Sequence, residues 1–239
     1  MSTTKLGRRG FLTTVGGLGV AGAMPNPAAA QAPSTAPAAP AKAADAPAGY
    51  TFFKPSEAAF VEAMVDHMCP KDELTGSGTE IGLAVFIDRA LAGSWGKGDR
   101  LYSQGPWQAG TANQGYQLAM VPADLYRAGI QGSDAYCRKT YQKTFRGCTV
   151  AQKEAFLKDL AAGKITLDGD LPGRAFFDVA YQSVVEGMYA DPVYGGNKDK
   201  VCWKMIGFPG VVATHARDIA RFNDGQRYNA APVSIADMS

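Results

Sequence analysis

The chain is poor in histidine and in the short motifs that carry common enzyme chemistry. Its 239 residues include two histidines, His67 and His215, and neither belongs to an H-x-x-x-H or H-E-x-x-H metal-binding sequence. No P-loop, G-x-S-x-G or C-x-x-C sequence occurs, and the C-x-x-C-H that attaches haem is missing. These absences argue against a P-loop enzyme, a serine hydrolase with a nucleophile elbow, and a c-type cytochrome.

One catalytic alternative survives these absences. A self-sufficient hydrolase or lyase could use Asp and Glu carboxylates together with His67 or His215. The simpler interpretation is that both histidines are structural, because no recognised ligand spacing surrounds either of them.

Charge of one sign and long apolar runs are also scarce. Without residues 1–30, which hold Lys5, Arg8 and Arg9 and no acidic residue, 21 basic side chains face 22 acidic ones, a formal net charge of −1. No basic stripe remains to neutralise phosphates, which argues against a nucleic-acid partner. Charged residues interrupt every later apolar run, so we expect membrane contact only through a partner.

Residues 1–30 have the three parts of a signal peptide. Lys5, Arg8 and Arg9 form a basic region, residues 11–23 are weakly apolar, and residues 28–30 supply a small-residue cleavage site. Arg8 and Arg9, followed by Phe11 and Leu12, resemble the twin-arginine (Tat) motif, and the glycine-rich apolar region suits that route. An ordinary Sec signal that contains two arginines is the alternative.

Residues 17–23, GLGVAGA, match the dinucleotide-binding spacing G-x-G-x-x-G. That motif works only between a strand and a helix N-terminus, where backbone N–H groups meet the phosphates. The flanking residues cannot form a βαβ unit, because a polar segment precedes the motif and an Ala/Pro-rich one follows it. We therefore interpret the match as accidental and expect no cofactor in this chain.

The mature chain is predicted to be a mainly α protein with one domain. An Ala/Pro-rich linker over residues 31–49 precedes a helical domain over residues 50–239, which has long, ordered loops rich in glycine and aromatic residues. The periodicity predicts helices capped by Ser56, by Thr79 and by Thr149 with Gln152, and one that starts at Pro122 and is interrupted at residues 129–132. The segment over residues 174–192 is expected to form the helix at the centre of the core. Residues 194–210 are expected to form a loop, and residues 211–222 a last short helix.

Four cysteines, Cys69, Cys137, Cys148 and Cys202, occur in a chain that the signal peptide directs to an oxidising compartment. Four thiols allow three full pairings, among which sequence cannot choose. The short spacing favours a Cys137–Cys148 disulfide, while free buried thiols and a bridge to another subunit remain alternatives.

Two aromatic, glycine-rich segments stand out. Residues 94–115 include Trp95, Tyr102 and Trp107, and such a long irregular stretch is usually functional or disordered. The aromatic side chains favour order against a partner surface. Residues 189–210 combine glycine and proline turns with Trp203 and other rigid aromatic residues.

The second segment resembles the gluconate 2-dehydrogenase subunit 3 family. The resemblance is carried by Asp191-Pro192, Tyr194-Gly195-Gly196-Asn197, Trp203-Lys204 and Ile206-Gly207-Phe208-Pro209-Gly210. FIDRALAG (86–93), GPW (105–107) and QGYQL (114–118) are similar to further parts of the family pattern, so the resemblance covers about residues 55–212. It implies that Trp107 and the motif residues Asp191, Pro192, Tyr194, Gly195, Gly196, Asn197, Trp203, Gly207, Pro209 and Gly210 hold the partner or the shape of the loops.

Membership of that family implies a division of labour within an oxidoreductase complex. A large subunit of the glucose-methanol-choline oxidoreductase type would bind FAD and oxidise gluconate, 2-ketogluconate or another sugar. A multihaem cytochrome c subunit would pass the electrons to membrane ubiquinone. The small subunit would lack a catalytic site, escort the large subunit through the Tat translocase and stabilise it in the periplasm, at the outer face of the inner membrane.

Overall fold

The computed structural model describes residues 49–102, 104–108, 110–111, 113–211 and 218–238. The predictions for the signal peptide, with Arg8, Arg9, Phe11 and Leu12, for residues 31–48 of the linker, and for His215 therefore lie outside the described residues. The described part of the chain is mainly helical, which confirms the predicted fold class.

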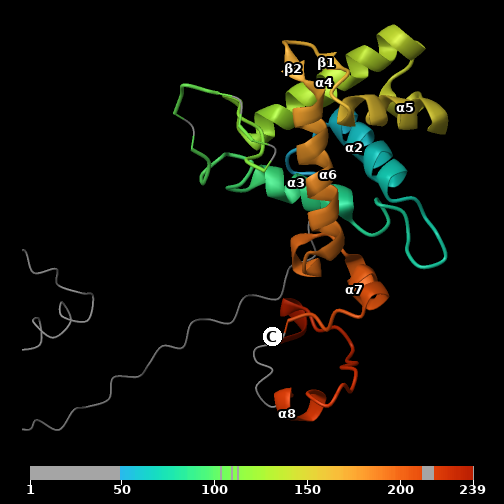
Figure 1. Cartoon of the computed structure of the whole chain (residues 1–239). Coiled ribbons are helices and arrows are strands. Elements are labelled where there is room, and N and C mark those ends of the chain that lie inside the picture. Colours follow the sequence, from blue (N-terminus) through green and yellow to red (C-terminus); the bar gives the residue numbers. More distant parts are fainter. Residues whose placement is uncertain (1–48, 103, 109, 112, 212–217, 239) are drawn as a thin grey trace, which may run out of the picture. The chain divides into compact units, whose positions relative to one another are not determined.

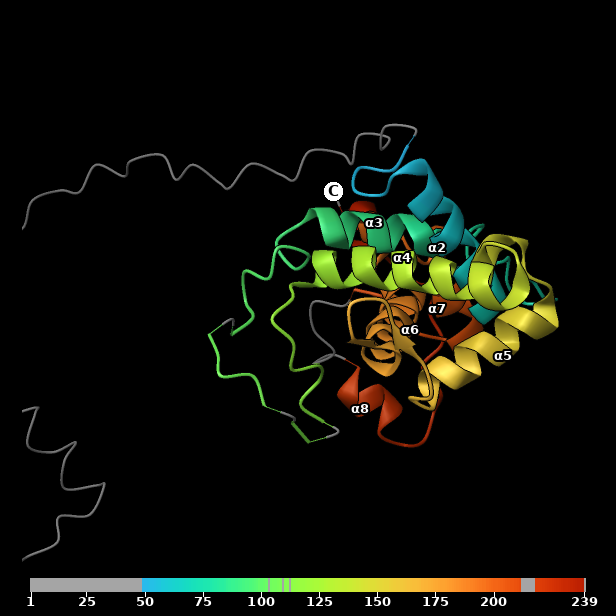
Figure 2. The ribbon, with the colours of Figure 1, turned by 90° about the horizontal axis from the view of Figure 1, so that it is seen from above.

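Helix α6 (Gly173–Tyr189) is the central element, as predicted. It packs against α3 (Leu83–Ala92), α4 (Pro122–Tyr141) and α5 (Val150–Ala161), and α2 (Pro55–Met68) packs against the same three helices (Figure 1). Figure 2, in which α6 is seen nearly end-on, shows α3 and α4 running side by side across it. The largest fully buried side chains include Tyr126, Phe60, Phe145, Phe156 and Phe176.

Two predicted helix starts are confirmed. The Thr149 hydroxyl accepts the N–H of Gln152 at 3.3 Å, and the Gln152 side chain accepts the N–H of Thr149 at 2.9 Å, so both residues satisfy free donors at the start of α5. Pro122 occupies the first turn of α4, where its missing N–H costs no helical hydrogen bond.

Two other predicted starts are wrong. The N-cap of α2 is Lys54, not Ser56, because Pro55 begins the helix and the Glu57 carboxylate accepts the Lys54 N–H at 2.9 Å. Thr79 does not cap α3, which begins four residues later, after Gly82 in the left-handed conformation (φ 88°). The Thr79 N–H instead donates to the Asp66 carboxylate at 2.7 Å and closes a turn.

Helix α4 runs without the interruption predicted at residues 129–132. A Cβ at Gly129 would overlap the ring of Phe176 on α6, and one at Gly132 would press on Leu167. The two glycines therefore mark close contacts of α4 with its neighbours. The helix break predicted from them is wrong.

The connections also contain short elements that the sequence did not reveal. β1 (Thr166–Leu167) and β2 (Leu171–Pro172) form an antiparallel hairpin before α6. Residues 194–210 are not a plain loop, because α7 (Val201–Ile206) lies within them. The remaining short elements are α8 (Ile219–Phe222) and the 3-10 helices η1 (Phe145–Gly147), η2 (Pro192–Tyr194), η3 (Lys198–Lys200) and η4 (Ile235–Met238).

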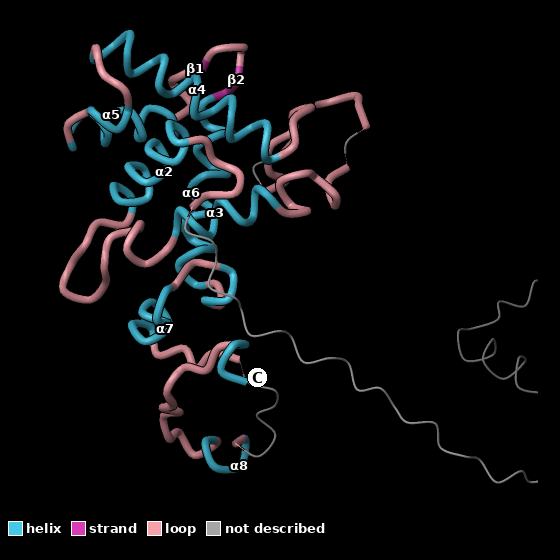
Figure 3. The backbone as a smooth tube through the Cα atoms, turned by 180° about the vertical axis from the view of Figure 1, so that it is seen from behind, coloured by secondary structure: helices cyan, strands magenta, loops and turns pink. Residues whose placement is uncertain are grey.

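The longest irregular connection joins α3 to α4 over residues 93–121, and Figure 3 shows it as an extended loop beside the helices. It is the segment in which the sequence predicted ordered aromatic side chains. Among the described residues, no helix combines the length and apolar character required to cross a membrane.

The contact between Gly129 and Phe176 can be tested by Gly129→Ala. In an open helix this change stabilises by about 1 kcal/mol, but here the added methyl group overlaps a buried ring. We expect a net loss of about 1–3 kcal/mol in the free energy of unfolding, measured by urea denaturation. Gly147→Ala, whose added Cβ meets only ordinary contacts, is the control. A more stable Gly129→Ala protein would contradict the proposed contact.

Candidate functional site

The start of the folded body is held by a buried carboxylate. Asp88 on α3 is 2% exposed and accepts the backbone N–H groups of Thr51 at 2.7 Å and of Phe52 and Phe53 at 2.9 Å each. Three hydrogen bonds to one carboxylate satisfy its negative charge inside the protein. They also fix the backbone directly after the predicted linker.

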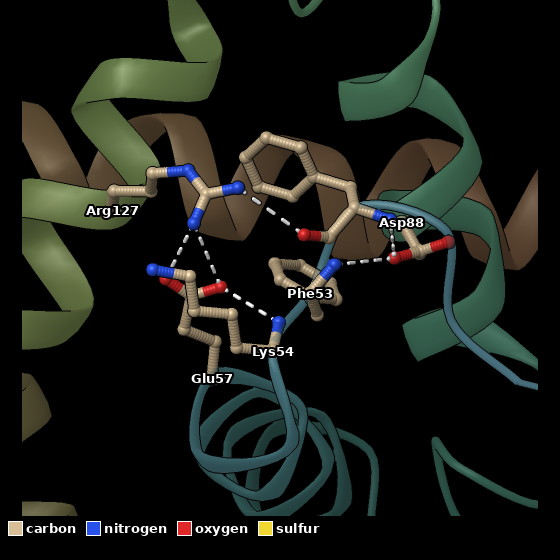
Figure 4. A network of polar contacts seen from close by, with 6 residues as sticks. Phe53, Lys54, Glu57, Asp88 and Arg127 are labelled. Carbon is tan, nitrogen blue, oxygen red and sulfur yellow. Dashed lines mark hydrogen bonds and ion pairs between the residues drawn. The ribbon is translucent and has the colours of Figure 1, made fainter.

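An arginine completes this attachment, which we call the N-terminal clamp (Asp88, Arg127 and Glu57). Arg127 on α4 donates to the Glu57 carboxylate at 2.8 Å and to the Phe52 carbonyl at 3.2 Å (Figure 4). Its guanidinium also lies 4.3 Å from the centre of the Phe52 ring, a cation–π distance. The clamp therefore joins α2, α3 and α4 to the segment that enters the body.

Sequence reasoning assigned no role to Asp88 or Arg127. Asp88 lies within the segment FIDRALAG, between the buried residues Ile87 and Leu91 of α3. An acidic residue on the apolar face of a helix is a signal of a buried acceptor, because a buried carboxylate needs donors. The signal does not reveal which donors it binds, since these lie more than thirty residues away in the chain.

The polar residues of the family motif make contacts within the chain. Asp191 accepts the N–H of Val193 at 3.0 Å and, with its other oxygen, that of Ile235 at 2.8 Å. Asn197 is fully buried, donates to the Ala190 carbonyl at 3.1 Å and accepts the Cys202 N–H at 2.9 Å. These side chains fix the path of the backbone around α7 and attach the C-terminal segment.

The motif glycines allow close backbone contacts. The Gly195 carbonyl lies against Gly82, Gly196 lies against Gly187, and Gly210 lies against Val233, in each case with no room for a Cβ. Gly207 ends α7 in the left-handed conformation (φ 70°). Pro192 starts η2, and the Pro209 carbonyl accepts the Val233 N–H at 3.0 Å.

The motif aromatics divide into a buried and an exposed set. Trp203 is buried, donates its indole N–H to the Tyr189 carbonyl at 2.8 Å and packs edge-on against Phe208. Tyr194 is 56% exposed, and three further apolar side chains of this region are also exposed: Met205, Ile206 and Phe208. The exposed set is available to a partner, whereas Trp203 supports it from within.

The loop between α3 and α4 contains an apolar hollow, which we call the aromatic groove. It has a volume of about 420 Å³, and its lining includes Leu101, Tyr102, Trp107, Tyr116, Leu118 and Met120. Tyr102 is 78% exposed, and Trp107 is partly exposed beside it. The Tyr116 hydroxyl donates to the Met120 carbonyl at 3.1 Å, and the Gly96 carbonyl accepts the Ala123 N–H at 3.0 Å, which connects the loop to α4.

A second hollow contains His67 together with Glu62, Asp66 and Glu154. His67 Nε2 lies 2.8 Å from a Glu154 oxygen, and the other Glu154 oxygen pairs with Lys158 at 3.0 Å. Lys158 and then His67 hold the pKa of Glu154 below its ordinary value. The nearby carboxylates of Glu62 and Asp66 accept the Tyr50 hydroxyl and the Thr79 N–H. Each acidic group therefore has a structural partner, which favours an ion pair across α2 and α5.

No cluster of three or more metal-ligating side chains occurs in the described part of the chain. The four cysteines are free thiols in the structure, and all four are buried. Burial is the largest cause of the raised pKa of Cys137, to about 12, and of Cys202, to about 11. These raised pKa values keep both thiols mostly protonated at neutral pH.

The model of one protein family, described as gluconate 2-dehydrogenase subunit 3, matches residues 55–210. The chain belongs to this family. The match runs from the first residue of α2 to Gly210, so it includes the N-terminal clamp, the aromatic groove and the motif around α7. No curated protein and no solved structure matched the chain. The family name describes a subunit of a multi-subunit dehydrogenase.

The clamp of this subunit can be tested by Asp88→Asn, which keeps the side-chain shape but replaces one acceptor oxygen with a donor. The amide nitrogen then faces at least one N–H among residues 51–53, which loses its hydrogen bond to a charged acceptor at a cost of about 1–3 kcal/mol of folding free energy. We expect a lower urea midpoint and faster hydrogen exchange at these amides. Asp99→Asn makes the same charge change at an exposed position and should leave both unchanged. Unaltered exchange in Asp88→Asn would contradict the clamp.

The contact between Lys200 and Asp237, which holds the C-terminal segment, predicts that the stability of the protein depends on pH. The Lys200 ammonium, 2.6 Å away, and the Ser234 N–H lower the pKa of Asp237 to about 2. Because this folded-state pKa lies below the unfolded value, the attachment contributes stability above pH 4 and loses it as pH falls toward 2. Carboxyl NMR should give a midpoint near 2, and Lys200→Met should raise it toward the ordinary value. A midpoint near 4 in the unmodified subunit would refute the contact.

Proposed function

We propose that this subunit is non-catalytic and that it escorts and stabilises an FAD-containing large subunit of the glucose-methanol-choline oxidoreductase type. The aromatic groove is the observation that carries the proposal. Exposed apolar side chains gathered on one long loop are typical of a protein interface, because burying apolar surface against a partner removes it from water. The family membership supports a partner within a dehydrogenase complex.

The groove suits a protein partner through the chemistry of its lining. Leu101, Tyr102 and Trp107 expose large, stiff side chains, which lose little conformational entropy when a partner covers them. A loop of this length without regular secondary structure is usually functional when it is ordered. The exposed Met205, Ile206 and Phe208 near α7 give the partner a second apolar contact.

The same proposal covers export and electron transfer. Flavin is inserted in the cytoplasm, so the loaded large subunit must cross the membrane folded, and the Tat translocase carries folded cargo. Arg8 and Arg9 of this subunit would supply the signal for both proteins. In the periplasm, FAD would oxidise gluconate, 2-ketogluconate or another sugar, and a multihaem cytochrome c subunit would pass the electrons to membrane ubiquinone.

The N-terminal clamp supports this escort role. Asp88 fixes residues 51–53, so the predicted linker emerges from a defined point on the folded body. A long Ala/Pro-rich linker before that point separates the signal from the bulk of the cargo. The translocase could therefore bind the signal while the large subunit stays attached to the body.

The proposal is tested by co-expressing the large subunit with variants of this one. Leu101→Asp with Tyr102→Asp places two charges in the aromatic groove and should lower the co-purified large subunit by about tenfold or more. Leu74→Asp, at another exposed leucine in the loop between α2 and α3, is the control. Arg8→Lys with Arg9→Lys should retain both proteins in the cytoplasm. Full periplasmic activity of the large subunit in cells without this chain would overturn the proposal.

A further inference from the structure

The four cysteines lie in the core as two neighbouring pairs. In each pair one cysteine follows the end of a helix and the other lies within a helix: Cys69 caps the end of α2 and Cys202 is in α7, while Cys148 follows η1 and Cys137 is in α4. All four belong to the same buried cluster. Cys69 and Cys202 are far apart in the sequence, whereas Cys137 and Cys148 are close in it.

The Cys137–Cys148 pair is formed by a chain reversal after α4. The Asp134 carboxylate accepts the Phe145 N–H at 2.9 Å, which holds the segment before Cys148 against the last turns of α4. Cys137 lies one turn beyond Asp134 on the same face of the helix. The Cys148 N–H donates to the Phe145 carbonyl at 3.1 Å, and the Cys148 thiol is near enough to raise the pKa of Cys137.

The Cys69–Cys202 pair is formed where the loop after α2 contacts the segment before α7. The Cys69 carbonyl accepts the Gly78 N–H at 2.8 Å, and the Ile81 carbonyl accepts the Lys198 N–H at 3.0 Å. Asn197 then accepts the Cys202 N–H and fixes the start of α7. The loop after Cys69 is thereby held beside the segment that leads into Cys202, and after burial the Cys69 thiol is the next cause of the raised pKa of Cys202.

We infer that the mature protein carries two intrachain disulfides, Cys69–Cys202 and Cys137–Cys148. The inference rests on the proposed function, because disulfides persist only in an oxidising compartment such as the periplasm. Of the three full pairings that four thiols allow, this one joins the neighbours in the fold. It also excludes the bridge to another subunit, since both members of each pair are used.

Each pair has one thiol through which an oxidant can enter. Cys69 and Cys148 are each 7% exposed, whereas Cys202 and Cys137 are completely buried. A protein disulfide of the thiol-oxidase class is attacked by the Cys148 thiolate, forming a mixed disulfide and releasing the oxidant's second sulfur as a thiolate. Cys137 then attacks Cys148 Sγ, and the mixed bond breaks. Two electrons and the two thiol protons pass to the oxidant, which leaves as a dithiol. Cys69 and Cys202 react in the same way.

The surroundings favour the oxidised state once it forms. Burial is the largest cause that raises the pKa of the Cys69, Cys137 and Cys202 thiols, and neighbouring thiol or carboxyl groups raise it further, so their thiolates are not favoured. Dithiols whose thiolates are unstabilised give disulfides that resist reduction, in contrast to catalytic pairs with acidic thiols. These properties indicate structural disulfides and not a redox-active pair.

Trypsin places each cysteine on a separate peptide, because a lysine or arginine lies between every two of them. The full chain should be reduced, unfolded, and refolded in a buffer of reduced and oxidised glutathione, then alkylated and digested without reductant. We expect the Cys69 peptide linked to the Cys202 peptide, and the Cys137 peptide linked to the Cys148 peptide. Mixed pairings, or four alkylated thiols, would overturn the inference. This experiment does not depend on the compartment, so its failure is distinct from a failure of export.

The chain recovered from the periplasmic fraction, in its complex, gives the second measurement. The same two linked peptides are expected there, and four alkylated thiols in that fraction would also overturn the inference. Recovery of the chain from the cytoplasm alone would instead contradict the proposed function, while refolding would still decide the pairing. Reduction should lower the urea midpoint of the unmodified chain. The fall should be smaller in C69A/C202A and C137A/C148A, most clearly in C69A/C202A, whose bridge closes the longer loop.

Discussion

Buried acceptors that bind the N–H groups of irregular backbone are the interaction on which this fold depends. Helices satisfy their own backbone groups, but much of this chain lies in loops, and a buried N–H without a partner is costly. Asp88 binds three such groups at the start of the body, Asp191 binds the C-terminal segment, and Asn197 fixes α7. Without these side chains the loops could not lie against the helical core.

This constraint separates the residues that shape the loops from those that remain for a partner. Asp191, Asn197 and Trp203 are directed inward and use their polar atoms on the backbone. Tyr102 and Tyr194 contribute little to the core and keep their rings in contact with solvent. A family motif can therefore be mostly structural and still serve recognition, because the inward residues determine where the outward ones stand.

The sequence predicted the fold class, the central helix and the starts marked by Pro122 and Thr149, because these signals are local. It failed where a distant contact decided the outcome. Gly129 suggested a helix break, but in the structure it gives room for the ring of Phe176. The short helix α7 depends on the hydrogen bond from the Cys202 N–H to Asn197 and on Lys200, which precedes the helix in the left-handed conformation. The candidate motif residues could be named from the resemblance, but Asp88 and Arg127 required the positions of three helices. The pairing of Cys69 with Cys202 likewise follows from tertiary contacts alone.

The proposed export as a folded protein would require a body that is stable before any disulfide forms, because the cytoplasm keeps thiols reduced. In the structure all four free thiols lie in the buried core, and the helices pack around α6 without a bridge. Oxidation would then join positions that folding has already brought together. It would add stability by restricting the unfolded chain, not by changing the native packing. An escort of this kind could bind its partner in one compartment and become resistant to unfolding in the next.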